Sequence, residues 1–204
     1  VYIWYHPKVG LWMGATPETL VQVTKNKFTT MSLAGTKTAK TKKEVKWTAK
    51  EYNEQKMVTD FITKNINDKV DKLKTHDLET VSAGKLYHLR TKISGEFKDI
   101  HQLKNVIEAL HPTPAICGLP RDFSKNFILE NENYEREFYS GFLGEINFGE
   151  NKSSSLYVNL RCMKIKKNIA AIYVGGGITK DSNPIEEWEE TVSKAKTMKS
   201  VLGK

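Results

Sequence analysis

The chain has 204 residues, of which 39% are hydrophobic, and it carries a formal net charge of +8 at pH 7. A chain of this length and composition can bury a hydrophobic core, and nothing marks it as disordered. No apolar run approaches the length of a membrane-spanning helix, so we expect a soluble protein with no membrane partner. The two cysteines favour a reducing, cytoplasmic location over a disulfide scaffold.

The positive charge is scattered, with short concentrations of lysine at 37–46 and 164–167. Because no recognisable nucleic-acid-binding module accompanies these lysines, specific binding to nucleic acid is not predicted. The charge is compatible with small anionic ligands, for which one or two placed cations are enough. The first five residues, Val1-Tyr-Ile-Trp-Tyr5, are typical of a strand already under way, so we expect a fragment of a longer chain.

Hydrophobic alternation and the positions of glycine and proline predict the secondary structure. Strands are expected at 1–6, 11–15, 21–24, 27–33, 85–97, 138–148, 155–165 and 169–174. Helices are expected at 43–66, 100–110, 121–131 and 184–202. The connections include a capped turn at 16–20, a linker with strand-like pieces at 67–84 and a proline-rich rigid loop at 111–120. Because strands and helices come in blocks, the predicted fold class is α+β, with a largely antiparallel sheet and flanking helices.

A run of three glycines, Gly175 to Gly177, joins the last predicted strand to the last helix. Glycine tolerates positive φ and lets a ligand or another segment approach the peptide N–H groups. Asn183 and Pro184 suit the start of the helix. The glutamates that follow interact favourably with the positive N-terminal end of the helix, but a cluster of acidic residues like this one is also typical of a cation site.

On the first long helix, Glu51 and Glu54 fall on the same arc as Trp47 and Val58. Two carboxylates on a face that enters the core must be protonated, paired with cations or bound to a metal ion. The alternative is that the apolar stripe begins only at Val58 and that both acids lie in solvent. Periodicity does not decide between these interpretations.

The last helix repeats the spacing with Glu187 and Glu190. Its apolar stripe is formed by Ile185, Trp188, Val192, Ala195 and Leu202. Glu190 points nearly away from this stripe, so Glu190 and Lys194 are interpreted as a surface i,i+4 pair. Two Glu-x-x-Glu pairs on two helices nevertheless suit Mg²⁺, which takes one or two carboxylates and leaves positions for water and substrate.

Four further residues are candidates for chemistry. Arg161 shares a face of the strand predicted at 155–165 with Tyr157 and Asn159, where it could bind a carboxylate or simply lie on an edge strand. His88 and His111 are candidates for proton transfer or for structural hydrogen bonds. Glu18 is a candidate general acid, although a glutamate in a helical first turn also interacts favourably with the dipole.

Together these stretches resemble the C-terminal part of the chorismate-utilising enzymes, and among them isochorismate synthase. Each piece is short, but they run in the family's order across almost the whole chain. The eight segments are 15–20 (Ala-Thr-Pro-Glu-Thr-Leu), 33–36 (Leu-Ala-Gly-Thr), 50–58 (Lys-Glu-x-x-Glu-x-x-Met-Val), 86–89 (Leu-Tyr-His-Leu), 110–115 (Leu-His-Pro-Thr-Pro-Ala), 135–141 (Glu-Arg-Glu-Phe-Tyr-Ser-Gly), 160–162 (Leu-Arg-Cys) and 175–191, which begins Gly-Gly-Gly-Ile and ends Glu-Trp-x-Glu-Thr.

The resemblance implies a site for chorismate built around one Mg²⁺. By position, Glu54 and Glu190 match the metal ligands, with Glu51 and Glu187 as the acids behind them. The groups that hold the enolpyruvyl carboxylate are matched by Arg161, Lys194 and the backbone at Gly175. The ring pocket is matched by Gly35, Thr36 and His88.

Glu18 matches the family's general acid, which protonates the departing C4 hydroxyl as water adds at C2 and gives isochorismate, a precursor in menaquinone or siderophore biosynthesis. In the family a lysine well before this acid activates the water, and none of the seventeen residues before Glu18 matches its context. We therefore expect a missing N-terminal portion of the same chain, and no activity from this fragment alone.

The resemblance leaves the product partly open. The segment 111–115 and Arg161-Cys162 favour water over ammonia as the nucleophile. Salicylate synthase, which adds pyruvate elimination to isochorismate formation, is the alternative. A non-catalytic fragment that binds chorismate or a metal ion is the alternative from a different class.

Overall fold

The computed structural model describes residues 1–83, 86–97 and 99–202, and it divides into two compact units. Unit 1 comprises Val1–Glu18, Asn133–Phe142 and the chain from Val158 on. Unit 2 comprises Thr19–Glu132 and Leu143–Tyr157. Within the described residues, no helix combines the length and apolarity that crossing a membrane requires.

Unit 2 is built on a six-stranded sheet with the order β5-β6-β4-β3-β8-β7. Its strands are β3 (Thr19–Thr24), β4 (Lys27–Thr38), β5 (Asp71–Ala83), β6 (Leu86–Glu96), β7 (Phe142–Phe148) and β8 (Ser153–Val158). Its helices are α1 (Ala49–Ile66), α2 (Leu103–Leu110), α3 (Pro114–Cys117) and α4 (Arg121–Asn131), with 3₁₀ turns at Lys42–Glu44 and Ile100–Gln102. The predicted hairpin around Lys25 and the helix at 121–131 are confirmed.

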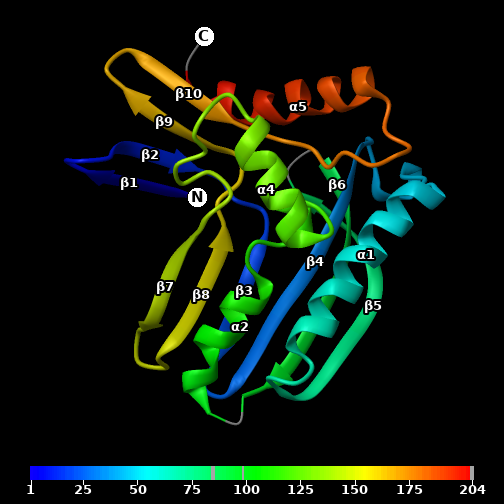
Figure 1. Cartoon of the computed structure of the whole chain (residues 1–204), viewed down its shortest axis with the longest axis vertical. Coiled ribbons are helices and arrows are strands. Elements are labelled where there is room, and N and C mark those ends of the chain that lie inside the picture. The colour runs from blue at the N-terminus through cyan, green and yellow to red at the C-terminus, as the bar shows by residue number, and fades with distance from the viewer. Residues whose placement is uncertain (84–85, 98, 203–204) are drawn as a thin grey trace. The chain divides into compact units, whose positions relative to one another are not determined.

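Helix α1 packs along β4 of this sheet (Figure 1). Its inward face buries Val58, Ile62 and Ile66, as the periodicity predicts. One buried position on this face is polar. Gln55 donates hydrogen bonds to Ser32 Oγ (2.9 Å) and to Thr91 Oγ1 (2.8 Å), which satisfies its amide against the sheet.

Unit 1 contains a four-stranded sheet with the order β1-β2-β9-β10, and helix α5 (Pro184–Lys199) contacts β10. The strands are β1 (Tyr2–His6), β2 (Gly10–Gly14), β9 (Cys162–Lys166) and β10 (Ile169–Tyr173). The core of the unit is formed by Trp12, Tyr139 and Cys162. All strand pairs with a defined register are antiparallel, so the predicted α+β fold with antiparallel sheets is confirmed.

Two predictions are wrong, one at the start of α1 and one in the segment before β6, whereas the strand that follows this segment is confirmed. The helix predicted at 43–66 begins at Ala49, because Thr48 and Glu51 form a capping box. The linker predicted at 67–84 is largely the long strand β5. The strand predicted at 85–97 is β6, which begins at Leu86, and Lys85 lies outside the described residues.

Further corrections concern the segments around Glu18 and Arg161. The turn predicted at 16–20 is irregular up to Glu18, and Thr19 already belongs to β3. The strand predicted at 155–165 is interrupted at 159–161, because β8 and β9 belong to different sheets. Arg161 has a φ of 47°, so the predicted alternation with Tyr157 and Asn159 does not hold. The strand predicted at 138–148 begins at Phe142.

Candidate functional site

Three connecting segments leave the four-stranded sheet at one end. Cys162, the first residue of β9, pairs with Gly14 at the end of β2 and with Tyr173 at the end of β10. Ala15 N–H also donates to the carbonyl oxygen of Arg161 (3.2 Å). The segments that carry Glu18, Arg161 and Gly175 therefore all start from this end of the sheet, although they are far apart in the sequence.

Glu18 is buried, with 4% of its surface exposed. Desolvation penalises the charged carboxylate and raises the pKa of Glu18 to about 7. The backbone of Glu18 is anchored by Val158 N–H, which donates to its carbonyl oxygen at 3.0 Å. Because Glu18 is not in a helical turn, an interaction with a helix dipole does not explain it. The carboxyl group exchanges between its neutral and ionised forms near neutral pH.

Arg161 lies in the short segment that connects β8 to β9 and is half-buried. Burial lowers the pKa of its guanidinium, but arginine keeps its charge in proteins. A partly dehydrated guanidinium on this segment is suited to binding a carboxylate through two parallel hydrogen bonds.

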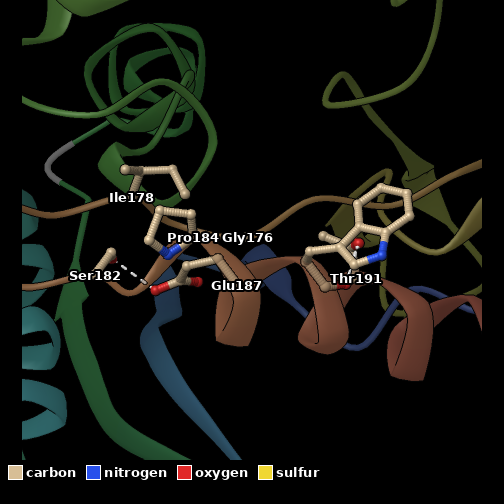
Figure 2. A pocket seen from close by; sticks show the side chains of 7 residues that line it. Gly176, Ile178, Ser182, Pro184, Glu187 and Thr191 are labelled. Atoms are coloured by element: carbon tan, nitrogen blue, oxygen red, sulfur yellow. Dashed lines mark hydrogen bonds between the residues drawn. The ribbon is translucent and has the colours of Figure 1, made fainter.

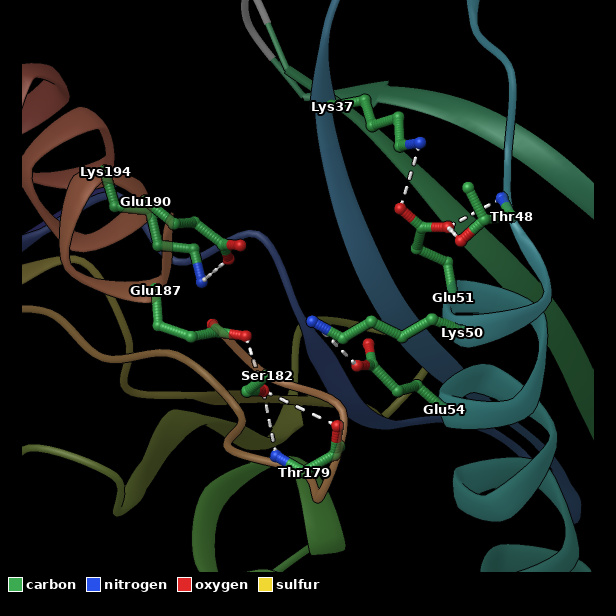
Figure 3. Close-up of polar contacts among 10 residues, drawn as sticks. All are labelled: Lys37, Thr48, Lys50, Glu51, Glu54, Thr179, Ser182, Glu187, Glu190 and Lys194. Atoms are coloured by element: carbon green, nitrogen blue, oxygen red, sulfur yellow. Dashed lines mark hydrogen bonds and ion pairs between the residues drawn. The ribbon is translucent and has the colours of Figure 1, made fainter. Parts of the chain in front are cut away.

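Lys194 connects α5 to the glycine run. Its Nζ pairs with Glu190 Oε1 at 2.7 Å, as Figure 3 shows. The same Nζ donates to the carbonyl oxygen of Gly175 at 2.9 Å. The predicted i,i+4 pair is confirmed, but the side chains of Lys194 and Glu190 are only 16% and 32% exposed. The pair is therefore half-buried and is not an ordinary surface pair. The structure brings together Lys194 and Gly175, two of the three groups that the resemblance assigns to one carboxylate.

Gly175, Gly176 and Gly177 all lie within the described residues, and none of them has a φ in the left-handed region. What position 175 requires is space, because a Cβ there would lie 2.6 Å from Tyr139 Oη. A Cβ at Gly176 would lie 3.4 Å from Glu187 Oε2, and a Cβ at Gly177 would have no described atom within 4 Å. Tyr139 was not a candidate residue, although it lies in the conspicuous segment 135–141.

Helix α5 presents a polar face to the rest of unit 1 in its first turns. Glu187 is only 8% exposed and accepts a hydrogen bond from Ser182 Oγ at 2.6 Å (Figure 2). Ile185 and Trp188, two members of the apolar stripe, are instead 69% and 68% exposed, so the stripe is not buried there. Polar anchors to the preceding loop set the orientation of this part of the helix. A hollow of about 350 Å³ beside Glu187 is lined mainly by Gly176, Ile178, Ser182, Pro184 and Trp188 (Figure 2).

In unit 2, Gly35 and Thr36 form a β-bulge opposite His88. The register of β4 and β6 shifts between Ala34 and Lys37, and Gly35 has a φ of 70°. The buried His88 places Nδ1 2.9 Å from the carbonyl oxygen of Gly35. Since a carbonyl oxygen can only accept, Nδ1 carries the proton, and Nε2 is the acceptor in neutral His88. All three residues assigned to the ring pocket therefore lie together.

The first turns of α1 hold the other pair of carboxylates. Glu51 accepts from Thr48 N–H (2.6 Å) and pairs with Lys37 Nζ (3.0 Å), as Figure 3 shows. Burial raises the pKa of Glu51, but the hydrogen bonds from Thr48 and Lys37 outweigh it and hold the pKa below its ordinary value. Glu54 lies 3.9 Å from Lys50 Nζ with its side chain 22% exposed. Both acids are thus half-buried and paired with cations, which is one of the outcomes expected for a core-facing pair.

The donor chemistry fits Mg²⁺. Each helix offers two carboxylates three residues apart, and hard oxygen donors are what this ion prefers. Within either unit, the described residues do not include three His, Cys, Asp or Glu side chains close enough to form a metal site. The assignment of Glu54 and Glu190 as ligands stays a prediction from the resemblance.

This fold is that of a known enzyme family. Residues 1–203 match the family model described as chorismate binding enzyme, and the chain belongs to this family. The chain is 29% identical over 202 residues to the isochorismate synthase MenF of Haemophilus influenzae, a match that covers 95% of this chain and 46% of the relative. It is 28% identical to the isochorismate synthase EntC of Escherichia coli, with 95% of this chain and 51% of the relative covered.

A solved structure gives the same result for the fold. The menaquinone-specific isochorismate synthase MenF of Escherichia coli matches with a TM-score of 0.84 and 28% identity, over 95% of this chain and 46% of that chain. The predicted resemblance is thereby confirmed. The chain spans about half the length of the relatives it matches.

Gly175→Ala is expected to destabilise the protein by roughly 1–3 kcal/mol, because the new methyl group collides with Tyr139 Oη. Urea unfolding measures the effect. Gly177→Ala is the matched control and should change stability by less than about 1 kcal/mol, since that position is open. Tyr139→Phe in the Gly175→Ala background should recover part of the loss, and strictly additive effects would contradict the proposed collision.

Glu18→Gln is expected to raise the free energy of unfolding above neutral pH. Burial raises the pKa of Glu18 from its ordinary 4.5 to about 7. The stability contributed by the bound proton is therefore fully present below 4.5 and is lost as the pH rises through 7, by on the order of 3 kcal/mol. Glutamine has no proton to lose. Urea unfolding of both proteins at about pH 4.5 and about pH 8 should show the variant gaining stability relative to the wild type as the pH rises. A pH-independent difference would contradict the raised pKa.

Proposed function

We propose that this chain is the C-terminal part of an Mg²⁺-dependent enzyme that isomerises chorismate to isochorismate. The observation that carries the proposal is Glu18, a buried carboxyl group with a pKa of about 7 on a segment that leaves the same sheet end as Arg161 and Gly175. The names of the relatives support this choice of reaction.

Glu18 acts as the general acid in the proposed reaction. A water oxygen forms a bond to C2, both conjugated ring double bonds shift, and the bond between C4 and its hydroxyl breaks. The neutral Glu18 carboxyl gives its proton to the departing hydroxyl, which leaves as water, and the attacking water loses its own proton to a base. An acid with a pKa near 7 still holds its proton in about half of the molecules at neutral pH and is well matched to this transfer.

Arg161, Lys194 and the backbone of Gly175 bind the enolpyruvyl carboxylate in this proposal. The contacts of Lys194 with Gly175 and Glu190 support it, because they hold the ammonium group in place before a ligand arrives. The carboxylate is expected to take over one of these contacts. His88, with its proton held on Nδ1 by Gly35, lines the ring pocket together with Thr36.

Glu54 and Glu190 are the proposed ligands of the Mg²⁺, with Glu51 and Glu187 behind them. When bound, the ion neutralises the ring carboxylate of the substrate and fixes its position. The assignment of residues from both units to one ion rests on the resemblance. Their carboxylate chemistry and their partial burial support it.

The base that accepts the water's proton is proposed to lie outside these 204 residues. The resemblance assigns it to a lysine before Glu18, and no residue in 1–17 matches that lysine's context. The 204-residue chain is therefore expected to bind Mg²⁺ and chorismate without turning chorismate over, and isochorismate formation by this chain alone would exclude the assignment.

The test is chromatography of the products that the full-length polypeptide forms from chorismate and Mg²⁺. Isochorismate alone is the expected product, whereas salicylate with pyruvate would identify a salicylate synthase instead. Glu190→Ala should abolish Mg²⁺-dependent turnover, and Glu189→Ala, which alters an exposed neighbour on the same helix, should leave it unchanged. If the full-length polypeptide binds both chorismate and Mg²⁺ but forms no product, the protein is a binding protein and not an enzyme.

A further inference from the structure

The loop before α5 holds the hydroxyl group of Ser182 in one orientation. Ser182 N–H donates to the carbonyl oxygen of Thr179 at 3.1 Å, and Thr179 N–H donates back to Ser182 Oγ at 3.0 Å. Glu187 Oε1 lies 2.6 Å from Ser182 Oγ and, as a carboxylate oxygen, can only accept, whereas Thr179 Oγ1 lies 3.5 Å away, so the hydroxyl proton is directed to Glu187 (Figure 3). The hydroxyl therefore links the backbone of the loop to a buried carboxylate.

The two oxygens of Glu187 have different neighbours. Oε1 accepts from Ser182, whereas Oε2 lies next to the backbone of Gly176, where a Cβ would come within 3.4 Å of it. A carboxylate that is 8% exposed needs hydrogen-bond donors to compensate for its lost hydration. The Ser182 hydroxyl supplies one of them and limits the rotation of a flexible side chain.

The same loop also fixes the start of α5. Asn183, the next residue, caps the helix by accepting from Ile185 N–H (2.9 Å) and Glu186 N–H (3.5 Å). Glu190 lies three residues after Glu187, so their side chains occupy neighbouring positions on the helix surface. An anchor at Glu187 and the Lys194 contact at Glu190 together orient the two carboxylates of this helix.

We propose that Ser182 is a positioning residue, whose hydroxyl orients the Glu187 carboxylate and through it the metal-binding face of α5. This inference rests on the proposed function, because the orientation of Glu187 matters for activity only if an ion binds at this face. Removal of a group that orients a metal ligand without touching the ion typically weakens metal affinity about 10–100-fold. Ser182 acts on the proposed ligand Glu190 through Glu187, so its removal is expected to have an effect at the lower end of this range.

The experiment measures Mg²⁺ affinity by calorimetry for Ser182→Ala and Ser182→Thr in the full-length polypeptide, together with thermal unfolding. Ser182→Ala should weaken Mg²⁺ binding by about tenfold or more, and Ser182→Thr, which keeps a hydroxyl, should recover most of it. Turnover by Ser182→Ala should be restored by excess Mg²⁺. Thr179→Val is the comparison variant, because it removes the neighbouring hydroxyl, whose Oγ1 lies 3.5 Å from Ser182 Oγ, but keeps the backbone N–H that donates to Ser182. Since 3.5 Å is a long contact and the backbone hydrogen bond remains, this variant should lose much less Mg²⁺ affinity than Ser182→Ala.

A double-mutant cycle separates positioning from a general effect on the loop. In a Glu187→Gln background, Ser182→Ala should cause little further loss of Mg²⁺ affinity if the hydroxyl acts through the carboxylate. Wild-type affinity in Ser182→Ala, an equal loss in Thr179→Val, or an undiminished loss in the Glu187→Gln background would each overturn the role of Ser182. If the wild-type protein binds no Mg²⁺, the proposed metal site itself is overturned. If the wild-type protein binds Mg²⁺ and one of these results is still found, only the role of Ser182 is overturned.

Discussion

The pairing of β9 with both β2 and β10 is the constraint on which the candidate site of unit 1 depends. Cys162 is completely buried and lies opposite both Gly14 and Tyr173, so the antiparallel register fixes where three chain segments leave the sheet. A shift of this register by one residue would turn every side chain of β9 to the other face and would separate the segments that carry Glu18, Arg161 and Gly175. Strand pairing therefore determines which segments start from the same end of the sheet, and the candidate side chains of unit 1 lie on these segments.

The local surroundings of two glutamates shift their pKa values in opposite directions. Glu18 is shielded from water, and desolvation raises its pKa to about 7. Glu51 is also partly shielded, but the hydrogen bonds from Thr48 and Lys37 lower its pKa overall, so that it stays ionised. This difference supports the roles proposed for Glu18 and Glu51.

Much of the fold could be predicted from local patterns, because the β3–β4 hairpin and α4 have clear turn, alternation or periodicity signals. The break at Arg161 could not be predicted in this way, because apolar alternation continues across 155–165 while the chain passes from one sheet to another. The orientation of α5 could not be predicted either. A helical wheel assumes that the apolar stripe is buried, whereas the contacts of Glu187 and Lys194 with the preceding loop determine how this helix is oriented. The roles assigned to the candidate residues rest on the resemblance. Their environments, and the part played by Ser182, depend on contacts that no sequence pattern contains.

The central claim is that Glu18 is a carboxylic acid that still holds its proton near neutral pH. It is tested most directly by following the protonation of this one side chain in the 204-residue chain. Isotope-edited infrared or carbon NMR titration, with Glu18→Gln used to assign the signal, reports the group without requiring turnover. We expect a midpoint at about pH 7 for Glu18. A midpoint at the ordinary value of 4.5 would contradict it, because Glu18 would then be ionised at neutral pH and unable to donate a proton.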